Sequence, residues 1–282
     1  MKVTARQLRV MSVDKLYGTS NTYRGVTKMK TSYQPQNDYY NATTLLDTYM
    51  GSSSSINQSQ PRDSHRVFHR RDNLFSVGNY FEGIYLLRSG SAKSFITSRD
   101  GEEHITKFYY PGDMLGIDGF DAHVHTQTVR FLETSSVCFI KESQINSLIQ
   151  TSPDFRNGLL QSMSHTLASD SAMMMCLSTC SSEQKVAQFL LDLSFGFSDR
   201  NLSCSEFMLS MTRTDIANYL GMAIETVSRV FASFQQKNII AVKLRYLSIL
   251  DFEALNSIVA IDNCSQTLAK KSNIKRVKQA LN

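Results

Sequence analysis

The chain has 282 residues, of which 41% are hydrophobic and 20% charged, an ordinary composition for a soluble globular protein. Its apolar runs are all shorter than the roughly 18–20 residues that cross a bilayer. Its first six residues, MKVTAR, lack the apolar segment of a secretory signal, so we expect a cytoplasmic protein with no membrane partner. The net charge of +5 permits an anionic partner without requiring one, and five irregularly spaced cysteines argue against a disulfide scaffold.

Residues 1–61 are polar and weakly periodic, and they end in a Ser-rich run at 51–55. This composition predicts an arm with little packing of its own. The first thirty residues carry seven Lys and Arg side chains against the single acid Asp14. Such a bias could contact nucleic-acid phosphates, although a solvated tail is the favoured interpretation.

Residues 62–152 show short apolar stretches separated by turn residues. The stretches cover 83–87, 92–96, 105–109 and 129–140, and Gly-containing turns lie at 89–91, 100–102 and 111–113. Strands at this spacing are typical of a compact antiparallel β-roll or sandwich. We therefore predict a sensor-like β domain.

A long helix is predicted from Asp154 to Leu177, within a segment 153–181 that also includes a hinge. Pro153 precedes it in a helix-starting Ser-Pro-Asp sequence. Apolar and small residues recur at a/d-like spacing, which predicts a parallel two-helix seam of a homodimer. The seam residues are Leu159, Met163, Thr166, Asp170, Met173 and Leu177. A helix packed on its own domain is the alternative, and Asp170 would bring two carboxylates face to face, which weakens association.

A second, smaller domain is predicted over residues 182–263, and a helix-turn-helix is its main feature. Thr212 with Asp215 three positions later resembles a capping box, and it starts a short helix over 213–220. Gly221 suits the left-handed turn at the end of that helix. A second helix follows over 224–236.

The second helix has one apolar and one polar face. Val227, Phe231 and Phe234 are spaced for burial. Glu225, Ser228 and Arg229 project together from the other face, near the helix start, as base-reading residues of a recognition helix do. Arg can bond to guanine and Glu to cytosine, so this triad suits a G·C pair in double-stranded DNA.

Several other polar residues are expected to contact the DNA backbone. Residues 239–249 read as a two-stranded wing. The residues predicted to meet phosphates are Thr212, Arg213, Thr226, Lys243 and Arg245. The basic tail 264–282 could add non-specific phosphate contacts, but a solvated tail is equally consistent with its composition.

These residues resemble the CRP/FNR superfamily, and its FNR branch in particular, over about residues 62–260. The most specific stretch is 207–221, FMLSMTRTDIANYLG, continued by the Glu-x-x-Ser-Arg pattern of Glu225, Ser228 and Arg229. Segments 85–90 and 132–138 also resemble that branch. The resemblance implies an α+β fold with an N-terminal antiparallel β-roll, a long dimerisation helix and a C-terminal winged helix-turn-helix. It further implies a non-enzymatic transcription regulator that binds palindromic TTGAT…ATCAA sites and contacts RNA polymerase.

Two ligand sets associated with the superfamily are incomplete, so we expect no cofactor. A [4Fe–4S] cluster takes four cysteine ligands, and Cys138 is the only cysteine within residues 1–138. Cyclic-nucleotide binders place Glu and an Arg-Ser/Thr pair around the phosphate. The corresponding stretch 112–128 contains Asp118 but no Arg.

Two other functions stay open at this point. One is a haem- or metal-binding gas or redox sensor of the same superfamily, using the pairs His65 with His69 or His123 with His125, or the thiols Cys176 and Cys180. Isolated pairs of this kind are more often surface histidines or small apolar cysteines. The other is a sensor protein whose helix-turn-helix serves only protein contact. The sequence contains no pattern typical of a catalytic site, and it leaves the signal and the target genes undefined.

Overall fold

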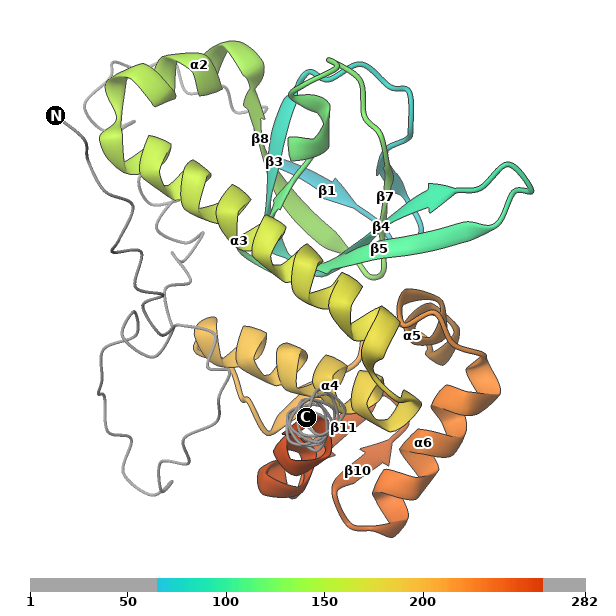
Figure 1. Ribbon diagram of the computed structural model, residues 1–282. Coiled ribbons are helices and arrows are strands. Elements are labelled where there is room, and N and C mark those ends of the chain that lie inside the picture. The colour runs from blue at the N-terminus through green and yellow to red at the C-terminus, as the bar shows by residue number, and fades with distance from the viewer. Residues whose placement is uncertain (1–64, 261–282) are drawn as a thin grey trace, which may run out of the picture. The chain divides into compact units, whose positions relative to one another are not determined.

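The computed structural model describes residues 65–260, and they form a β-roll, a helical segment and a C-terminal winged-helix domain (Figure 1). This architecture confirms the predicted α+β class with its antiparallel sheets, long helix and helix-turn-helix. The predicted arm 1–61 and basic tail 264–282 lie outside the described residues. Among the described residues, no helix has the length and apolarity that a membrane span needs.

Two antiparallel sheets make up the β-roll. Its elements are β1 (His65–Phe68), β2 (Asn73–Phe75), β3 (Gly83–Ser89), β4 (Ala92–Thr97), β5 (Glu103–Tyr109), β6 (Met114–Leu115), the 3-10 turn η3 (Ile117–Gly119), β7 (Thr128–Phe131) and β8 (Ser135–Lys141). One sheet has the order β1-β8-β3-β6, and the other has the order β2-β7-β4-β5. In the second order β5 is an edge strand.

Strand β3 is apolar over residues 83–87 because both of its faces are buried there. Tyr85 and Leu87 point into the space between the two sheets. Ile84 and Leu86 alternate with them and pack on the opposite side, against the helical segment. Since successive side chains of a strand point to opposite faces, the unbroken run of apolar residues follows from this double burial.

The helical segment consists of α2 (Glu142–Thr151) and α3 (Pro153–Thr179). The side chain of Ser152 caps α3 by accepting a hydrogen bond from the backbone N–H of Phe155 at 3.3 Å. Pro153 occupies the first turn, where a missing N–H costs nothing. The predicted helix start is therefore confirmed, whereas α2 was not foreseen from the sequence.

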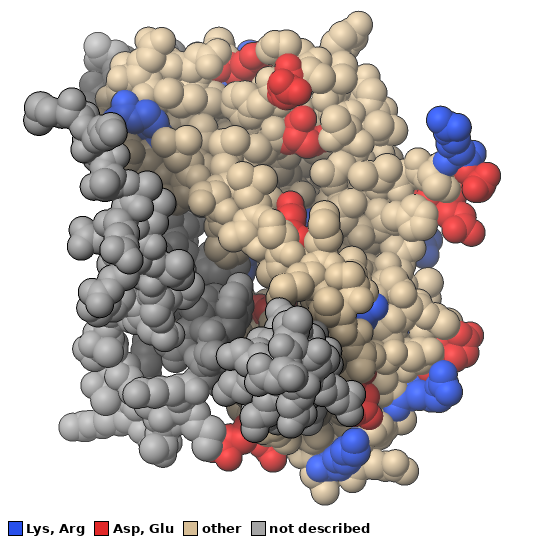
Figure 2. Space-filling view, in the orientation of Figure 1, with Lys and Arg blue, Asp and Glu red and all other residues tan. Residues whose placement is uncertain are grey.

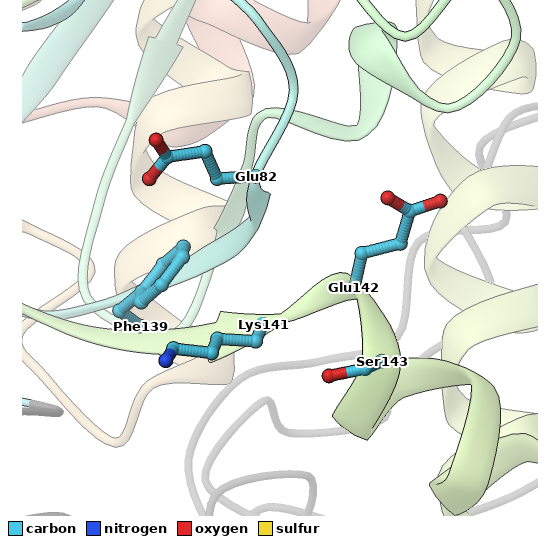
Figure 3. Close-up of a pocket in the computed structure, with 5 residues that line it drawn as sticks. All are labelled: Glu82, Phe139, Lys141, Glu142 and Ser143. Carbon is cyan, nitrogen blue, oxygen red and sulfur yellow. The ribbon is translucent and has the colours of Figure 1, made fainter.

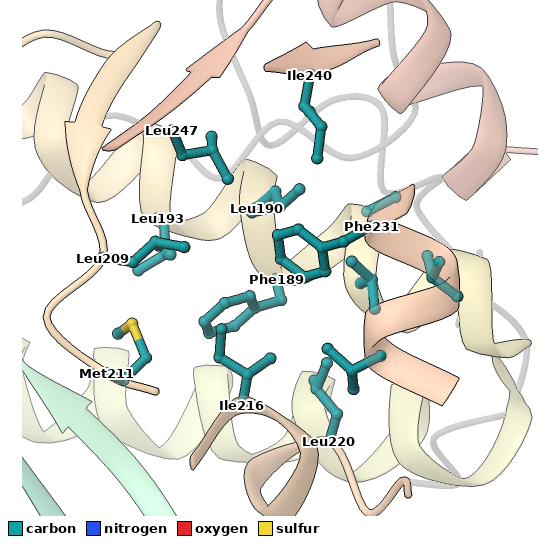
Figure 4. Packing of buried hydrophobic residues seen from close by; sticks show 14 of the residues in the cluster. Phe189, Leu190, Leu193, Leu209, Met211, Ile216, Leu220, Phe231, Ile240 and Leu247 are labelled. Carbon is teal, nitrogen blue, oxygen red and sulfur yellow. The ribbon is translucent and has the colours of Figure 1, made fainter. Parts of the chain in front are cut away.

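The winged-helix domain packs three helices against a small sheet. Its elements are α4 (Ser182–Asp199), β9 (Glu206–Met208), α5 (Arg213–Tyr219), α6 (Ile224–Gln236), β10 (Ile240–Lys243) and β11 (Tyr246–Ile249). The sheet order is β10-β11-β9, and residues 252–260 are again helical. Phe189 and Leu190 of α4, Ile216 of α5 and Phe231 of α6 converge in one core (Figure 4).

The turn that joins β3 to β4 depends on Gly90. Its φ of +84° lies in the left-handed region, and a Cβ placed there would stand 2.1 Å from the Ser135 Oγ and 2.7 Å from the Ser135 Cα. Ser135 has little freedom to move because it is buried and its Oγ accepts a hydrogen bond from the Ser91 N–H. Gly101, in the turn between β4 and β5, has the same φ but no atom within 4 Å of its would-be Cβ.

Substituting alanine at each of these two glycines distinguishes the cost of a left-handed backbone from the cost of steric overlap. Both Gly90→Ala and Gly101→Ala should bear the left-handed cost of about 1–2 kcal/mol. Gly90→Ala should lose about 1–3 kcal/mol more, because the new methyl overlaps Ser135. Chemical denaturation of both variants measures the difference. Equal free energies of unfolding would show that the contact with Ser135 does not constrain this turn.

Candidate nucleic-acid interface

Helix α5 begins with the predicted capping box. The Thr212 N–H donates to Asp215 Oδ2 at 2.9 Å, and the Asp215 N–H donates to Thr212 Oγ1 at 3.1 Å. Partial burial acts to raise the pKa of Asp215, but hydrogen bonds from Lys93 and Thr212 and the charge of Lys93 outweigh it, so the pKa lies below its ordinary value. The carboxylate is therefore ionised at neutral pH, as both the cap and the helix N-terminus favour.

The turn between α5 and α6 confirms the role predicted for Gly221. Its φ is +59°, which glycine adopts without strain. The Met222 N–H donates to the Ala217 carbonyl at 2.9 Å across this turn, in the pattern of a Schellman motif. The motif closes α5 and sets the direction in which α6 starts.

Helix α6 separates its side chains as the sequence predicts. Val227, Phe231 and Phe234 are at most 2% exposed and belong to the core. Glu225, Ser228 and Arg229 are all exposed on the other side of the helix. The structure thus brings the three predicted base-reading residues together on one polar surface.

Two of these side chains are held by neighbours on their own helix. Arg229 Nη2 donates to Thr226 Oγ1 at 3.2 Å. The Ser228 hydroxyl donates to the Ile224 carbonyl at 2.8 Å, so its lone pairs remain available as acceptors. The other donors of the Arg229 guanidinium point from an exposed side chain and can reach a partner outside the chain.

Arg213 occupies a more enclosed place than the sequence suggests. Its guanidinium lies 3.4 Å from the centroid of the Phe231 ring, a cation–π contact. Burial lowers the pKa of Arg213 to about 10, so the group stays charged at neutral pH. Half-buried on the apolar face of α6, Arg213 has a packing role that the sequence pattern did not reveal.

The predicted wing is the β10–β11 hairpin. Lys243 pairs with Tyr246, and the two-residue turn between them contains Leu244 and Arg245. Lys243 and Arg245 are exposed. Leu244 is 96% exposed with a φ of +59°, so the tip of the wing is an open basic turn.

The exposed apolar residues of α3 form a stripe along the helix. Apart from Met175 (65% exposed), which lies beside the row, they are Leu160 (59%), Met163 (37%), Leu167 (69%), Met174 (73%) and Leu177 (38%), and the exposed Asp170 completes the heptad spacing. In Figure 2 the surface over α3 is mostly tan, with few charged atoms. We call these six residues the α3 stripe.

The α3 stripe differs from the predicted seam at three of the six predicted positions. Leu159 is only 5% exposed because it packs against the β-roll of its own chain. Thr166 is partly buried and accepts a hydrogen bond from Lys107 Nζ at 3.1 Å, and Met173 is also partly buried. Three predicted positions thus turn toward their own chain, whereas Met163, Asp170 and Leu177 belong to both sets. The sequence could not distinguish the registers because Leu159 and Leu160, like Met173 and Met174, are adjacent and similar.

The interior of the β-roll does not suit a cyclic nucleotide. His125 is 3% exposed, and its ring stacks on Phe75 with centroids 3.6 Å apart. Asp118 Oδ1 lies 3.3 Å from His125 Nδ1, and Asp118 Oδ2 accepts hydrogen bonds from the backbone N–H groups of Thr126 and Gln127. An aromatic stack and a carboxylate therefore occupy the segment in which a phosphate would need cationic donors.

The cysteines within residues 65–260 are not arranged for an iron–sulfur cluster either. Cys138 is fully buried in β8, within the apolar cluster beneath α2 and α3. Burial and the neighbouring Cys180 thiol raise the pKa of Cys176 to about 12, so Cys176 is an uncharged thiol near neutral pH. Within residues 65–260, no group of three or more His, Cys, Asp or Glu side chains is arranged to hold a metal ion.

The histidine pairs face different surroundings. His123 lies on the surface, with its Nδ1 3.6 Å from Glu142, whereas His125 is enclosed beside Phe75. His65 contacts Arg88 Nη1. His123 and His125 therefore lie in different surroundings, one on the surface and one enclosed.

A shallow hollow lies at the junction of β8 and α2. It has a volume of about 470 Å³ and is lined by Glu82, Phe139, Lys141, Glu142 and Ser143 (Figure 3). Two carboxylates and one ammonium group give its rim mixed charge. It shares no residue with the polar surface of α6 or with the α3 stripe.

Known families match both parts of the described chain. Residues 184–258 match a Crp-like helix-turn-helix domain, and residues 65–152 match a cyclic nucleotide-binding domain. The transcriptional activator protein Anr of Pseudomonas protegens is 42% identical over 178 residues, which are 63% of this chain and 73% of that protein. The fumarate and nitrate reduction regulatory protein of Vibrio cholerae is 34% identical over 218 residues, which are 75% of this chain and 87% of that protein.

A solved structure supports the same fold. FixK2 from Bradyrhizobium japonicum superposes with a TM-score of 0.62 at 23% identity, covering 69% of this chain and 96% of that one. The family-model match and the curated relatives show a DNA-binding transcription regulator with a helix-turn-helix in its C-terminal domain. The chain therefore belongs to the CRP/FNR superfamily of transcription regulators, a family of DNA-binding proteins and not of enzymes.

Proposed function

We propose that this regulator binds palindromic DNA with TTGAT half-sites as a homodimer and thereby controls transcription initiation. The observation that carries the proposal is the joint exposure of Glu225, Ser228 and Arg229 on one side of α6. The opposite side of the same helix is anchored by fully buried side chains, so the polar triad has a fixed direction. A rigid helix that presents three such groups is suited to the major groove.

The chemistry of the triad suits a single G·C pair in each half-site. An arginine fork bonds bidentately to guanine O6 and N7, and a glutamate accepts from cytosine N4. In this chain Arg229 and Glu225 would take these roles. Ser228 would assist, since its hydroxyl has free lone pairs and tolerates a thymine methyl group nearby.

Backbone contacts would come from both sides of α6. Thr212 lies exposed at the start of α5, and Thr226 lies at the start of α6. Lys243 and Arg245 extend from the wing as exposed cations that suit phosphates. Arg213, half-buried on Phe231, would contact a phosphate only at the edge of this surface.

The α3 stripe would form the homodimer seam. Its apolar members are spaced over about three heptads, and paired stripes of this kind bury each other in a parallel coiled coil. Asp170 lies within the stripe and would face its own counterpart, which makes the association weaker than an all-apolar seam would. A two-fold dimer matches the two-fold symmetry of a palindromic site.

We further propose that the DNA-bound dimer acts in the cytoplasm as an activator that contacts RNA polymerase. Support comes from the relatives, of which the Anr protein of Pseudomonas protegens is named a transcriptional activator.

Replacing Arg229 should show whether its side chain recognises the G·C pair. Arg229→Ala should weaken binding to a TTGAT…ATCAA duplex by about 1–3 kcal/mol and relax the preference for the G·C pair. Arg229→Lys should also relax that preference, because a lysine keeps the charge but loses the bidentate fork. Fluorescence anisotropy with cognate and G·C-substituted duplexes measures both effects.

The matched control is Arg99→Ala, which removes an exposed arginine from the turn between β4 and β5. It should leave the affinity unchanged. If Arg229→Ala binds the duplex as tightly as the unmodified protein, the assignment of Arg229 is wrong. If the unmodified protein fails to bind any palindromic duplex, a helix-turn-helix used only for protein contact becomes the better interpretation.

Adjacent residues of α3 should differ sharply in their effect on assembly. Leu167→Ala should weaken dimerisation by roughly 1–3 kcal/mol through lost apolar burial, and Asp170→Ala should strengthen it. Thr166→Ala should leave it unchanged, because Thr166 bonds to Lys107 of its own chain. Sedimentation equilibrium gives the three dissociation constants. A larger effect of Thr166→Ala than of Leu167→Ala would show that the seam has the register predicted from the sequence, which includes Thr166.

A further inference from the structure

The winged helix has only a short covalent link to the rest of the chain. Helix α3 ends at Thr179 and α4 begins at Ser182, so two residues connect them. Yet polar residues of the β-roll also bond directly to the winged helix. We infer that Lys93, Asp113, Arg200, Asp215 and Asn218 form an intrachain clamp that positions α6 for reading a palindrome. This inference rests on the DNA-reading function proposed above.

The first contact of the clamp joins β4 to α5. Lys93 Nζ lies 2.8 Å from Asp215 Oδ1, and the two side chains are 11% and 15% exposed. Lys93 is therefore too enclosed to contact a phosphate itself. Its charge is balanced by the same carboxylate that caps α5, so the start of the helix-turn-helix is tied to the β-roll.

The second contact uses the open edge of β5. As an edge strand, β5 has backbone groups that no neighbouring strand satisfies. Asn218 Oδ1 accepts a hydrogen bond from the Ile105 N–H at 2.6 Å, and Asn218 Nδ2 donates to the Glu103 carbonyl at 2.6 Å. One side-chain amide thus replaces a missing strand at two points, which fixes the orientation of α5 and not only its distance.

The third contact lies at the other end of the domain, where α4 ends. Arg200 Nη2 donates to Asp113 Oδ1 at 2.7 Å, and Arg200 Nε donates to the Pro111 carbonyl at 2.7 Å. Asp113 in turn accepts a hydrogen bond from the Tyr110 N–H, which holds the turn after β5. A guanidinium group that donates to two partners in this way fixes the orientation of the two segments that it joins as well as their distance.

Aromatic packing fills the space between these contacts. Phe108 of β5 meets Tyr219 of α5 edge-on, with ring centroids 5.1 Å apart. Phe108 also belongs to the core cluster of the winged helix. The polar contacts therefore border an apolar interface and select one of its possible orientations.

The clamp leaves the reading surface open. Its members come from β4, the β5–β6 turn, α5 and the end of α4, and Glu225, Ser228 and Arg229 on α6 stay exposed while it is closed. The contacts therefore act as positioning contacts and do not mask the reading residues. A palindrome is read only when both recognition helices have the correct spacing, about one helical turn of DNA apart.

Opening the clamp should accordingly weaken binding to a palindrome of two half-sites and leave the affinity for a single half-site unchanged. Opening it lets the winged helix adopt other orientations, and the apparent affinity falls with the fraction of correctly oriented dimers. A single half-site imposes no spacing, so its affinity should not change. This difference separates a positioning role from damage to α6 itself.

The test compares Lys93→Met, Asn218→Ala and the double variant as full-length proteins. Anisotropy is measured with a palindromic TTGAT…ATCAA duplex and with a duplex that contains one half-site. The double variant should bind the palindrome about tenfold more weakly and the half-site within about twofold of the unmodified protein. The separate variant Lys93→Arg, which keeps the cation, should bind the palindrome about as tightly as the unmodified protein does. The control Lys141→Met removes a lysine of β8 that is no part of the clamp.

The salt dependence of DNA binding distinguishes loss of the clamp from loss of a phosphate contact. Loss of one phosphate contact reduces the slope of log K against log salt by about 1, whereas opening the clamp should leave the slope as it is. Unchanged or tighter binding of the palindrome by the double variant would overturn the inference, as would an equal loss on the half-site. Failure of the unmodified protein to bind either duplex specifically would instead refute the proposed DNA-reading function.

Discussion

The burial of one face of α6 determines which of its side chains lie on the surface of the winged-helix domain. Val227, Phe231 and Phe234 are held in the core by α4, α5 and the small sheet, and the helical period then places Glu225, Ser228 and Arg229 outside. The Schellman turn at Gly221 and the cap at Thr212 set where α6 begins. Each of these features is local in sequence, yet together they aim a polar surface with the precision that base recognition requires.

Local features of this kind could be predicted from the sequence, and the reasons are physical. A capping box, a left-handed glycine and a 3.6-residue period each depend on residues within a few positions of one another. The helix-turn-helix and the wing were therefore predicted nearly to the residue. Helix α2 was missed although Ile145, Leu148 and Ile149 have helical spacing, because it is short and follows β8 directly, with no turn residue between the two elements.

Features that depend on distant residues could not be predicted in this way. Both registers of α3 contain leucine and methionine, and only the packing of Leu159 on the β-roll decides which face is exposed. The pairing of Lys93 with Asp215 spans 122 positions. Neither side chain is unusual in its own segment, so no single-sequence pattern marks them as partners. The stacking of His125 on Phe75 is likewise a product of the β-roll topology.

The filled interior of the β-roll has a consequence for how such a protein could respond to its surroundings. His125 and Asp118 occupy the segment in which related folds would receive a small molecule, and the exposed α3 stripe carries an acidic residue at its centre. For a pair of chains that associates through this stripe, the amount of dimer rises with the square of the monomer concentration when monomer predominates. The copy number of the protein would then set the amount of dimer, so synthesis and proteolysis would control how much of it can occupy a palindrome.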